Sequence, residues 1–133
     1  MSDIINTSGK RKTAVARAVV REGTGKVTIN KVPLDVYSPE LAKLKIMEPL
    51  GLVTEKVKLV DIAVNVKGGG VMGQAEAART AISRGLVDFF KDDEMEAMFK
   101  DYDRTLMIND VRRKLPKNPL GRGARKKRQK SYR

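Results

Sequence analysis

Three glycines at fixed spacing form the part of this sequence that is best suited to chemistry. Gly68, Gly70 and Gly73 follow a run of alternating apolar residues and open a run with helical periodicity. Glycines let a backbone approach a ligand closely, and the free N–H groups at the start of a helix can hold a phosphate. A strand, a glycine turn and a helix in this order therefore predict a turn that faces an anion.

Several readings of this turn have to be compared. A dinucleotide fingerprint needs further strands and an acid at the end of the next one, whereas Asp88, Asp92 and Asp93 fall in helical sequence. A Walker-type nucleotide loop requires a lysine where Gln74 stands. A tight, closely packed turn without a ligand remains open. We favour the interpretation that the backbone amides of Gly68, Gly69 and Gly70, beside Gln74, face a nucleic-acid phosphate.

Cations form a second group of candidate residues near the N-terminus. Lys10, Arg11, Lys12, Arg17 and Arg21 fall within twelve residues, and alternation points Arg11, Arg17 and Arg21 to one side of a strand. The cluster indicates an anionic partner, and a solvated strand face is the alternative.

Two further arginines, Arg79 and Arg84, lie five positions apart on the predicted central helix. We expect both on the helix surface. Arg84 precedes Gly85, so it can reach a backbone that approaches at that glycine.

The end of the chain is strongly cationic. Residues 112–133 contain 11 Lys and Arg and no acid, a charge of +11, whereas residues 1–111 contain 17 cations and 16 acids, a charge of +1. Nucleic acid would neutralise these cations and release counterions. An extended stretch of residues 116–133 reaches at most ~60 Å, which suits threading into folded RNA. The candidate RNA-binding residues here are Arg112, Arg113, Lys114, Arg122, Arg125, Lys126, Lys127, Arg128 and Lys130.

The composition excludes several classes of protein. The sequence contains no Cys and no His, which excludes disulfides, thiolate zinc sites and imidazole-based catalysis. No spacing of acids marks a paired acid and base, so we predict no catalytic residue, cofactor or metal. The apolar runs are shorter than the ~20 residues of a membrane helix, and the polar start shows no secretory signal. We therefore expect a cytoplasmic protein that does not bind membranes.

The periodicities predict one α/β body at residues 1–115 and an extended basic tail at residues 116–133 that is disordered when free. Residues 1–9 are expected to be a loose entry, and Asp110 to cap one more helical turn. The predicted strands are 13–21, 27–29 (paired with the first as a hairpin), 60–67 and 105–108. The predicted helices are one that Ser38 caps and that Pro49 and Gly51 end, burying Leu41, Leu44 and Met47; one at 73–90; and one from Asp92 that buries Met95, Met98, Phe99 and Tyr102.

Three segments then make the chain recognisable. They are the stretch from Gly9 to Ala18 with 25–30 after it, the stretch from Gly68 to Leu86 with Gly73-Gln74 and Ser83-Arg84-Gly85, and the ending from Gly121 to Arg133. Together they resemble the universal small-subunit ribosomal protein family S9, in its archaeal form, over nearly the whole length. The middle segment meets the family's pattern at every constrained position.

This resemblance implies a structural protein of the ribosome. Such proteins sit in the head of the small subunit, where a two-layer body of a small mixed sheet and helices binds ribosomal RNA beside neighbouring ribosomal proteins. The resemblance also implies a left-handed βαβ crossover. The tail is expected to thread toward the peptidyl-site tRNA, with Ser131, Tyr132 and Arg133 at the anticodon stem-loop. Because Tyr132 stands where bacterial members carry a cation, we expect stacking or hydroxyl bonding there. A nonspecific nucleic-acid-compacting protein and a nucleotide-dependent enzyme are the alternatives.

Overall fold

The computed structural model describes residues 3–127 and residue 131. The strands are β1 (Ile4–Arg11), β2 (Ala14–Glu22), β3 (Val27–Ile29), β4 (Val32–Pro33) and β5 (Val60–Lys67). The helices are α1 (Glu40–Leu52), α2 (Thr54–Val57), α3 (Val71–Phe90) and α4 (Asp93–Tyr102), with 3-10 turns η1 (Leu34–Val36) and η2 (Arg104–Leu106). Among the residues described, no helix has the length and apolarity needed to span a membrane.

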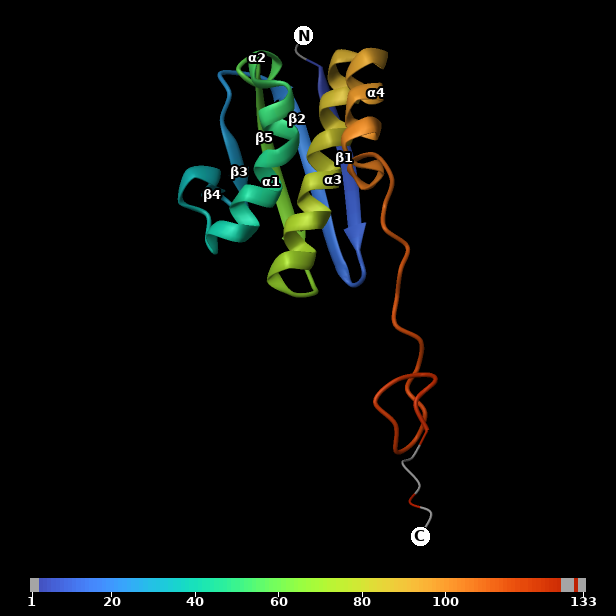
Figure 1. The fold of residues 1–133 in the computed structure, drawn as a ribbon. Coiled ribbons are helices and arrows are strands. Elements are labelled where there is room, and N and C mark those ends of the chain that lie inside the picture. The colour runs from blue at the N-terminus through green and yellow to red at the C-terminus, as the bar shows by residue number, and fades with distance from the viewer. Residues whose placement is uncertain (1–2, 128–130, 132–133) are drawn as a thin grey trace.

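The five strands form one mixed sheet in the order β1-β2-β5-β3-β4. The pairs β1–β2, β2–β5 and β3–β4 are antiparallel, and β3 runs parallel to β5. Helices α1, α3 and α4 all lie on one side of this sheet (Figure 1). The molecule is therefore the two-layer α+β body that was predicted. The parallel pair β3 and β5 is joined through α1, and the hand of that crossover stays a prediction.

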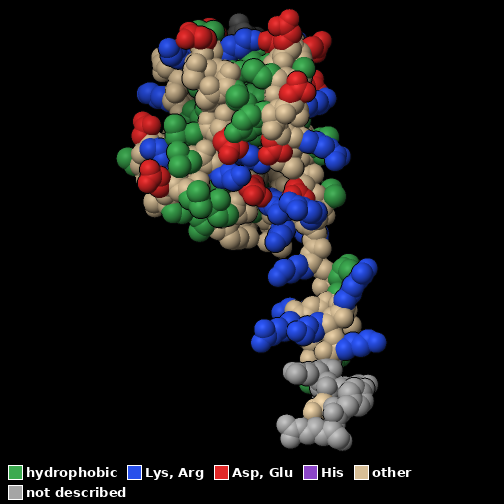
Figure 2. All heavy atoms as spheres, in the orientation of Figure 1, with side chains coloured by type: hydrophobic (Ala, Val, Ile, Leu, Met, Phe, Trp, Pro, Cys, Tyr) green, Lys and Arg blue, Asp and Glu red, His purple; other side chains and the backbone are tan. Residues whose placement is uncertain are grey.

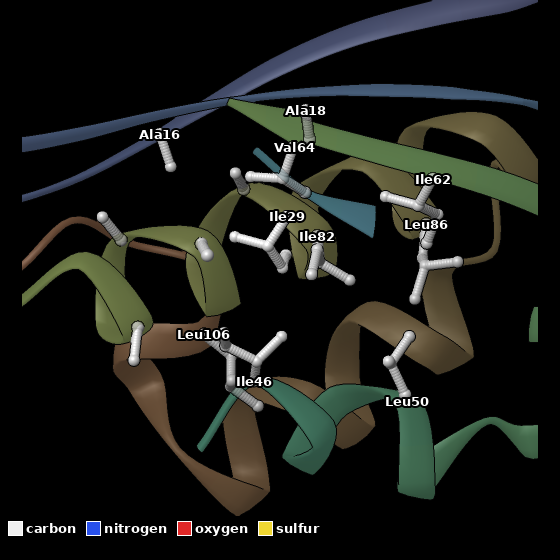
Figure 3. Close-up of a cluster of buried hydrophobic side chains, with 14 of the residues drawn as sticks. Ala16, Ala18, Ile29, Ile46, Leu50, Ile62, Val64, Ile82, Leu86 and Leu106 are labelled. Carbon is white, nitrogen blue, oxygen red and sulfur yellow. The ribbon is translucent and has the colours of Figure 1, made fainter. Parts of the chain in front are cut away.

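Alternation along β2 and β5 determines which face of the sheet the helices cover. Alternate residues from Ala14 to Val20 and from Val60 to Val66 are buried. Their side chains meet Ile82 and Leu86 of α3 and Ile46 of α1 in one apolar core (Figure 3). Among the residues that the structure describes, no helix lies on the opposite face of the sheet (Figure 1).

Small residues bring α3 unusually close to the first two strands. A Cβ on Gly9 would lie 2.3 Å from the Ala77 carbonyl oxygen, and one on Gly85 would lie 2.6 Å from Val20 Cγ2. No side chain larger than hydrogen fits at either contact. The close approach makes α3 the helix against which β1 is fixed.

The structure corrects several expectations about the elements. Residues 4–11 form β1 rather than a loose entry; its inward positions are Ile5, Thr7, Gly9 and Arg11, of which only Ile5 is a large apolar residue, so an apolar alternation is missing. Thr7 Oγ1 donates to the Ala81 carbonyl at 2.8 Å. Residues 105–108 begin in η2 instead of a strand. Asp110 starts no helical turn and forms an isolated bridge with Arg11.

Another correction concerns β3, which pairs with β5 and not with β2. The turn that precedes β3 is fixed to β5, because the Asp61 carboxylate of β5 accepts hydrogen bonds from the amides of Thr24 and Lys26, both at 3.0 Å. These bonds lower the pKa of Asp61, that from Lys26 most. As a result, β3 lies on the side of β5 that is opposite to β2.

Helices α1 and α4 form near the expected positions but present different faces. In α1, Ala42, Ile46, Pro49 and Leu50 are buried, whereas the three residues predicted to face the core are exposed: Leu41, Leu44 and Met47. Helix α1 also continues through Pro49 and Gly51 to Leu52, and Ser38 does not cap it. In α4 the buried residues are Met95 and Phe99, while Met98 and Tyr102 are exposed.

Beyond Asp110 the chain leaves the body and runs past the β1–β2 hairpin (Figure 1). Residues 118–124 turn back on themselves: the Asn118 amide donates to the Gly123 carbonyl at 3.3 Å, and the Gly121 amide to the Asn118 carbonyl at 3.1 Å. A Cβ on Gly121 would lie 2.2 Å from the Lys126 carbonyl oxygen. The tail therefore contains one compact turn.

Candidate nucleic-acid interface

The predicted glycine turn packs against the tip of the β1–β2 hairpin. Gly68 and Gly69 have φ of 79° and 68°, a region that side chains other than hydrogen disfavour. A Cβ on Gly68 would lie 2.5 Å from the Thr13 carbonyl oxygen, and one on Gly69 would lie 3.0 Å from Ala14 Cβ. The close-packing reading therefore accounts for these two glycines.

Gly70 and Gln74 shape the start of α3. Gly70 is the N-cap, and a Cβ there would meet nothing within 4 Å. Gln74 Nε2 donates to the Gly68 carbonyl at 3.1 Å. This hydrogen bond links the first turn of α3 to the start of the glycine turn. A groove beside the turn is lined by Lys12, Gly70 and Gly73 among others. Packing thus explains Gly68 and Gly69, while Gly70 remains open to a ligand.

Arg11 lies on the opposite side of the sheet from Arg17 and Arg21. The prediction that the three share one side is wrong for Arg11, because the turn at residues 12–13 places it at the end of β1, opposite the inward-facing Ala14. Its guanidinium forms ion pairs with Glu76 at 2.6 Å and with Asp110 at 2.8 Å. Arg11 is thus a cation that the protein itself neutralises.

The uncovered face of the sheet brings together three cations from three strands. In the strand register Lys10 is opposite Val15 and Val15 is opposite Lys67, so the two lysines stand about 10 Å apart. Arg17 lies two residues along β2 from Val15 and on the same face. All three are exposed, and none forms an ion pair within the part of the chain that the structure describes. We call Lys10, Arg17 and Lys67 the open-face cations.

Lys67 was missed as a candidate by reasoning from the sequence. The signal was present in the alternation of β5, which puts Val66 in the core and Lys67 on the other face. The pairing of β2 with β5, which brings Lys67 near Lys10, could not be predicted from the sequence.

Arg79 is buried, contrary to the expectation of a surface cation. It is 4% exposed, because α1 and the segment around η2 close over this part of α3. The guanidinium pairs with Glu48 at 2.5 Å and Asp103 at 3.3 Å, and donates to Thr105 Oγ1 at 2.9 Å. Burial acts to raise the pKa of Asp103, but hydrogen bonds from Thr105 and the charge of Arg79 lower it below its usual value. Arg79 therefore holds the body together and is not available to a partner.

Arg84 reaches backbone that approaches beside Gly85, as predicted. Its Nη1 donates to the Ser8 carbonyl at 3.0 Å and its Nε donates to the Met107 carbonyl at 2.8 Å. The side chain therefore links β1 to the segment that precedes the tail. This intramolecular role occupies donors that the sequence assigned to RNA.

The tail presents its cations to solvent. Arg112 forms a two-pronged pair with the Asp110 carboxylate, at 3.0 Å and 2.7 Å. The other described cations predicted to bind RNA are exposed and make no ion pair among described residues: Arg113, Lys114, Arg122, Arg125, Lys126 and Lys127. Figure 2 shows Lys and Arg side chains along the part of the chain that extends from the body, where no acidic side chain is seen in this view. Ser131 is exposed, whereas Arg128, Lys130, Tyr132 and Arg133 lie outside the described residues.

Comparison with known proteins gives a consistent result over the whole chain. The family model described as ribosomal protein S9/S16 matches residues 9–133. A protein of Thermoplasma volcanium named small ribosomal subunit protein uS9 is 60% identical over 98% of this chain and 99% of its own length. Proteins of the same name from Picrophilus torridus and Thermoplasma acidophilum are 52% and 59% identical over 100% and 96% of this chain, and over 100% and 98% of their own lengths. The chain belongs to the ribosomal protein S9 family.

Proposed function

We propose that this protein is a structural component of the small ribosomal subunit, acting in translation without catalysis. Its body is proposed to bind ribosomal RNA in the subunit head, beside neighbouring ribosomal proteins. The observation that carries the proposal is the gathering of free cations at one end of the molecule. The open-face cations, Lys12 at the hairpin tip and the start of the tail all lie toward that end.

The surface proposed for the RNA backbone is therefore narrower than the sequence suggested. It consists of the open-face cations with Lys12 and the exposed glycine turn at Gly70. Phosphate contacts from such residues position a protein on RNA without reading its sequence, and shape supplies the selectivity. Gln74, Arg79 and Arg84 support this surface indirectly, through the hydrogen bonds and ion pairs that they make with other parts of the body.

The tail is proposed to be a second binding element. Residues 116–133 are proposed to be disordered in the free protein and to order against RNA, because their like charges repel until phosphates neutralise them. Ser131, Tyr132 and Arg133 are proposed to contact the anticodon stem-loop of the peptidyl-site tRNA. The tyrosine offers stacking and a hydroxyl there, and the arginine offers a guanidinium.

Sedimentation of the tagged protein from a lysate in Mg²⁺ at moderate salt tests this function. We expect the full chain to run with small subunits, to survive a high-salt wash and to be released by ribonuclease. A chain that lacks Ser131 to Arg133 should still assemble, but its subunits should retain less peptidyl-site tRNA. A protein that stays at the top of the gradient, or that travels with DNA, would refute the ribosomal role and favour a nonspecific nucleic-acid-compacting one.

A further inference from the structure

The segment that leads into the tail runs beside the free edge of the sheet. β1 is the outermost strand, paired on one side with β2 alone. Along its other side lie residues 107–110, which follow η2 and precede the tail. An exposed strand edge offers unpaired N–H and C=O groups, so a segment placed there can be held by the backbone itself.

Arg84 joins the two backbones from beneath. As described above, its guanidinium donates to the carbonyls of Ser8 in β1 and Met107 in the adjoining segment. Because a guanidinium is planar and rigid, two such bonds fix both the spacing and the relative orientation of the segments. The neighbouring Gly85 allows β1 to come this close to α3.

Asn109 and Asp110 complete the attachment. Asn109 Oδ1 accepts a hydrogen bond from the Lys10 amide at 3.0 Å. One residue further on, Asp110 forms a parallel bridge with Arg11 and pairs with its guanidinium at 2.8 Å. Asp110 also accepts a hydrogen bond from the Arg112 amide at 3.0 Å, in addition to the two-pronged pair with the Arg112 side chain.

The attachment ends abruptly after Arg112. Among the described residues, 113–127 make hydrogen bonds within the tail and no hydrogen bond or ion pair with the body. The tail therefore has a fixed base and a free length, with the boundary at a cluster of four side chains. We call Arg84, Asn109, Asp110 and Arg11 the tail clamp.

We propose that Asn109, held by the Lys10 amide, and Asp110, held by Arg11, are positioning residues that set the direction in which the tail leaves the body, with Arg84 fixing Met107 just before them. The proposal rests on the proposed function of the tail as the element that reaches tRNA. A fixed base raises the effective concentration of the tail's end at a site on the same assembly. A released base adds residues 107–112 to the flexible length and removes the preferred direction, so the same contacts are made less often.

Distances within the free protein test the clamp directly. The chain contains no Cys, so two spin labels can be attached at introduced cysteines, Lys100→Cys on α4 and Arg113→Cys at the first residue beyond the attachment. Both positions are exposed and outside the clamp. The intact clamp should give one narrow distance distribution, and the double substitution Asn109→Ala with Asp110→Asn should broaden it clearly. Equal distributions in the two proteins would overturn the proposal.

Binding of tRNA to reconstituted small subunits tests the consequence. Subunits with the double substitution should bind peptidyl-site tRNA about two- to fivefold more weakly than wild-type subunits. Asp101→Asn is the matched control: it removes one negative charge from an exposed residue of α4 that forms no ion pair among the described residues, and it should change nothing. A thermal unfolding curve for each variant shows that the body is still folded.

The two proposals can fail separately in this experiment. If removal of Ser131 to Arg133 leaves tRNA binding unchanged, the proposed role of the tail is wrong, while the label distances still decide whether the clamp exists. If that removal weakens tRNA binding but the clamp variant binds as the wild type does, the tail role stands and the positioning role is refuted.

Discussion

At the scale of single residues, the contact between β1 and α3 depends on a glycine that has no Cβ. Gly9 faces the backbone of α3 at the point where a Cβ would overlap the Ala77 carbonyl. Neither backbone can move alone, because β1 is paired with β2 along its length and α3 packs against β1, β2 and β5. Overpacking at such a site forces a backbone shift rather than a change of rotamer.

We therefore expect Gly9→Ala to lower the free energy of unfolding by about 2 kcal/mol or more. Gly51→Ala is the matched control, because a Cβ there meets nothing within 4 Å and the residue lies in helix α1. It should leave stability unchanged or raise it by up to ~1 kcal/mol. Urea unfolding of both variants gives the comparison. Equal losses would contradict the close approach of β1 and α3.

Asp103 makes the stability of the body depend on pH in the acidic range. Its pKa in the folded protein lies below the ordinary value, so its contribution to stability is complete above the unfolded pKa of ~3.9 and is lost as the pH falls toward the folded pKa. Asp103→Asn should lower stability at neutral pH by about 1 kcal/mol, since Arg79 loses a charged partner and Asp103 is partly exposed.

The pH profile distinguishes this contribution from a general loss of packing. Between about pH 5 and pH 3 the wild type should lose more stability than Asp103→Asn, so the two curves should converge. Chemical unfolding at several pH values measures both curves. Parallel curves over this range would show that the Asp103 carboxylate contributes nothing that protonation removes.

At the scale of elements, the sequence was informative where one period dominated. The alternation of β5 and the stripe of α3 predicted both elements, since each buries one complete face. β1 carries no such alternation, because Thr7 and Gly9 follow Ile5 at its inner positions. The face of α1 was mispredicted because Leu41 and Leu44 satisfy the same helical spacing as Ile46 and Leu50. Only the position of α3 beside α1 decides between these two stripes.

The two stripes of α1 should differ sharply when they are truncated. Ile46 is fully buried and Leu44 is 54% exposed. Ile46→Ala should cost about 2–5 kcal/mol of stability, whereas Leu44→Ala should change it by no more than ~0.5 kcal/mol. Thermal or urea unfolding of the two single variants checks this order. A large loss from Leu44→Ala would mean that α1 is rotated about its axis relative to the described packing.

At the scale of the whole molecule, the positions of the cationic segments could be predicted from the sequence. Which of their cations are paired with other residues of the protein could not. The charge of residues 112–133 is visible in the sequence, and so is the cluster after Gly9. The sequence could not reveal that Arg11 pairs with Glu76 and that Arg79 pairs with Glu48. Nor could it reveal that Arg84 donates to backbone carbonyls, because all these partners lie on other elements. Net charge therefore overstates what the body offers to RNA, and the tail gains in relative importance.

The salt dependence of RNA binding measures this division between body and tail. Arg125, Lys126 and Lys127 are exposed tail cations, and their joint replacement by Gln removes three positive charges. If each contacts a phosphate, the slope of log K against log salt concentration should become shallower by about 2–3.

Replacing Lys58, Lys100 and Arg104 by Gln removes the same net charge from exposed positions on the body, outside the open face. With the head domain of small-subunit ribosomal RNA as ligand, this control should keep the wild-type slope. Filter-binding titrations at four or five salt concentrations suffice for the three proteins. If both triple variants change the slope equally, binding follows total charge and the tail has no privileged contact with RNA. If the tail variant alone changes it, these three tail cations contact phosphates in addition to any contacts of the open face.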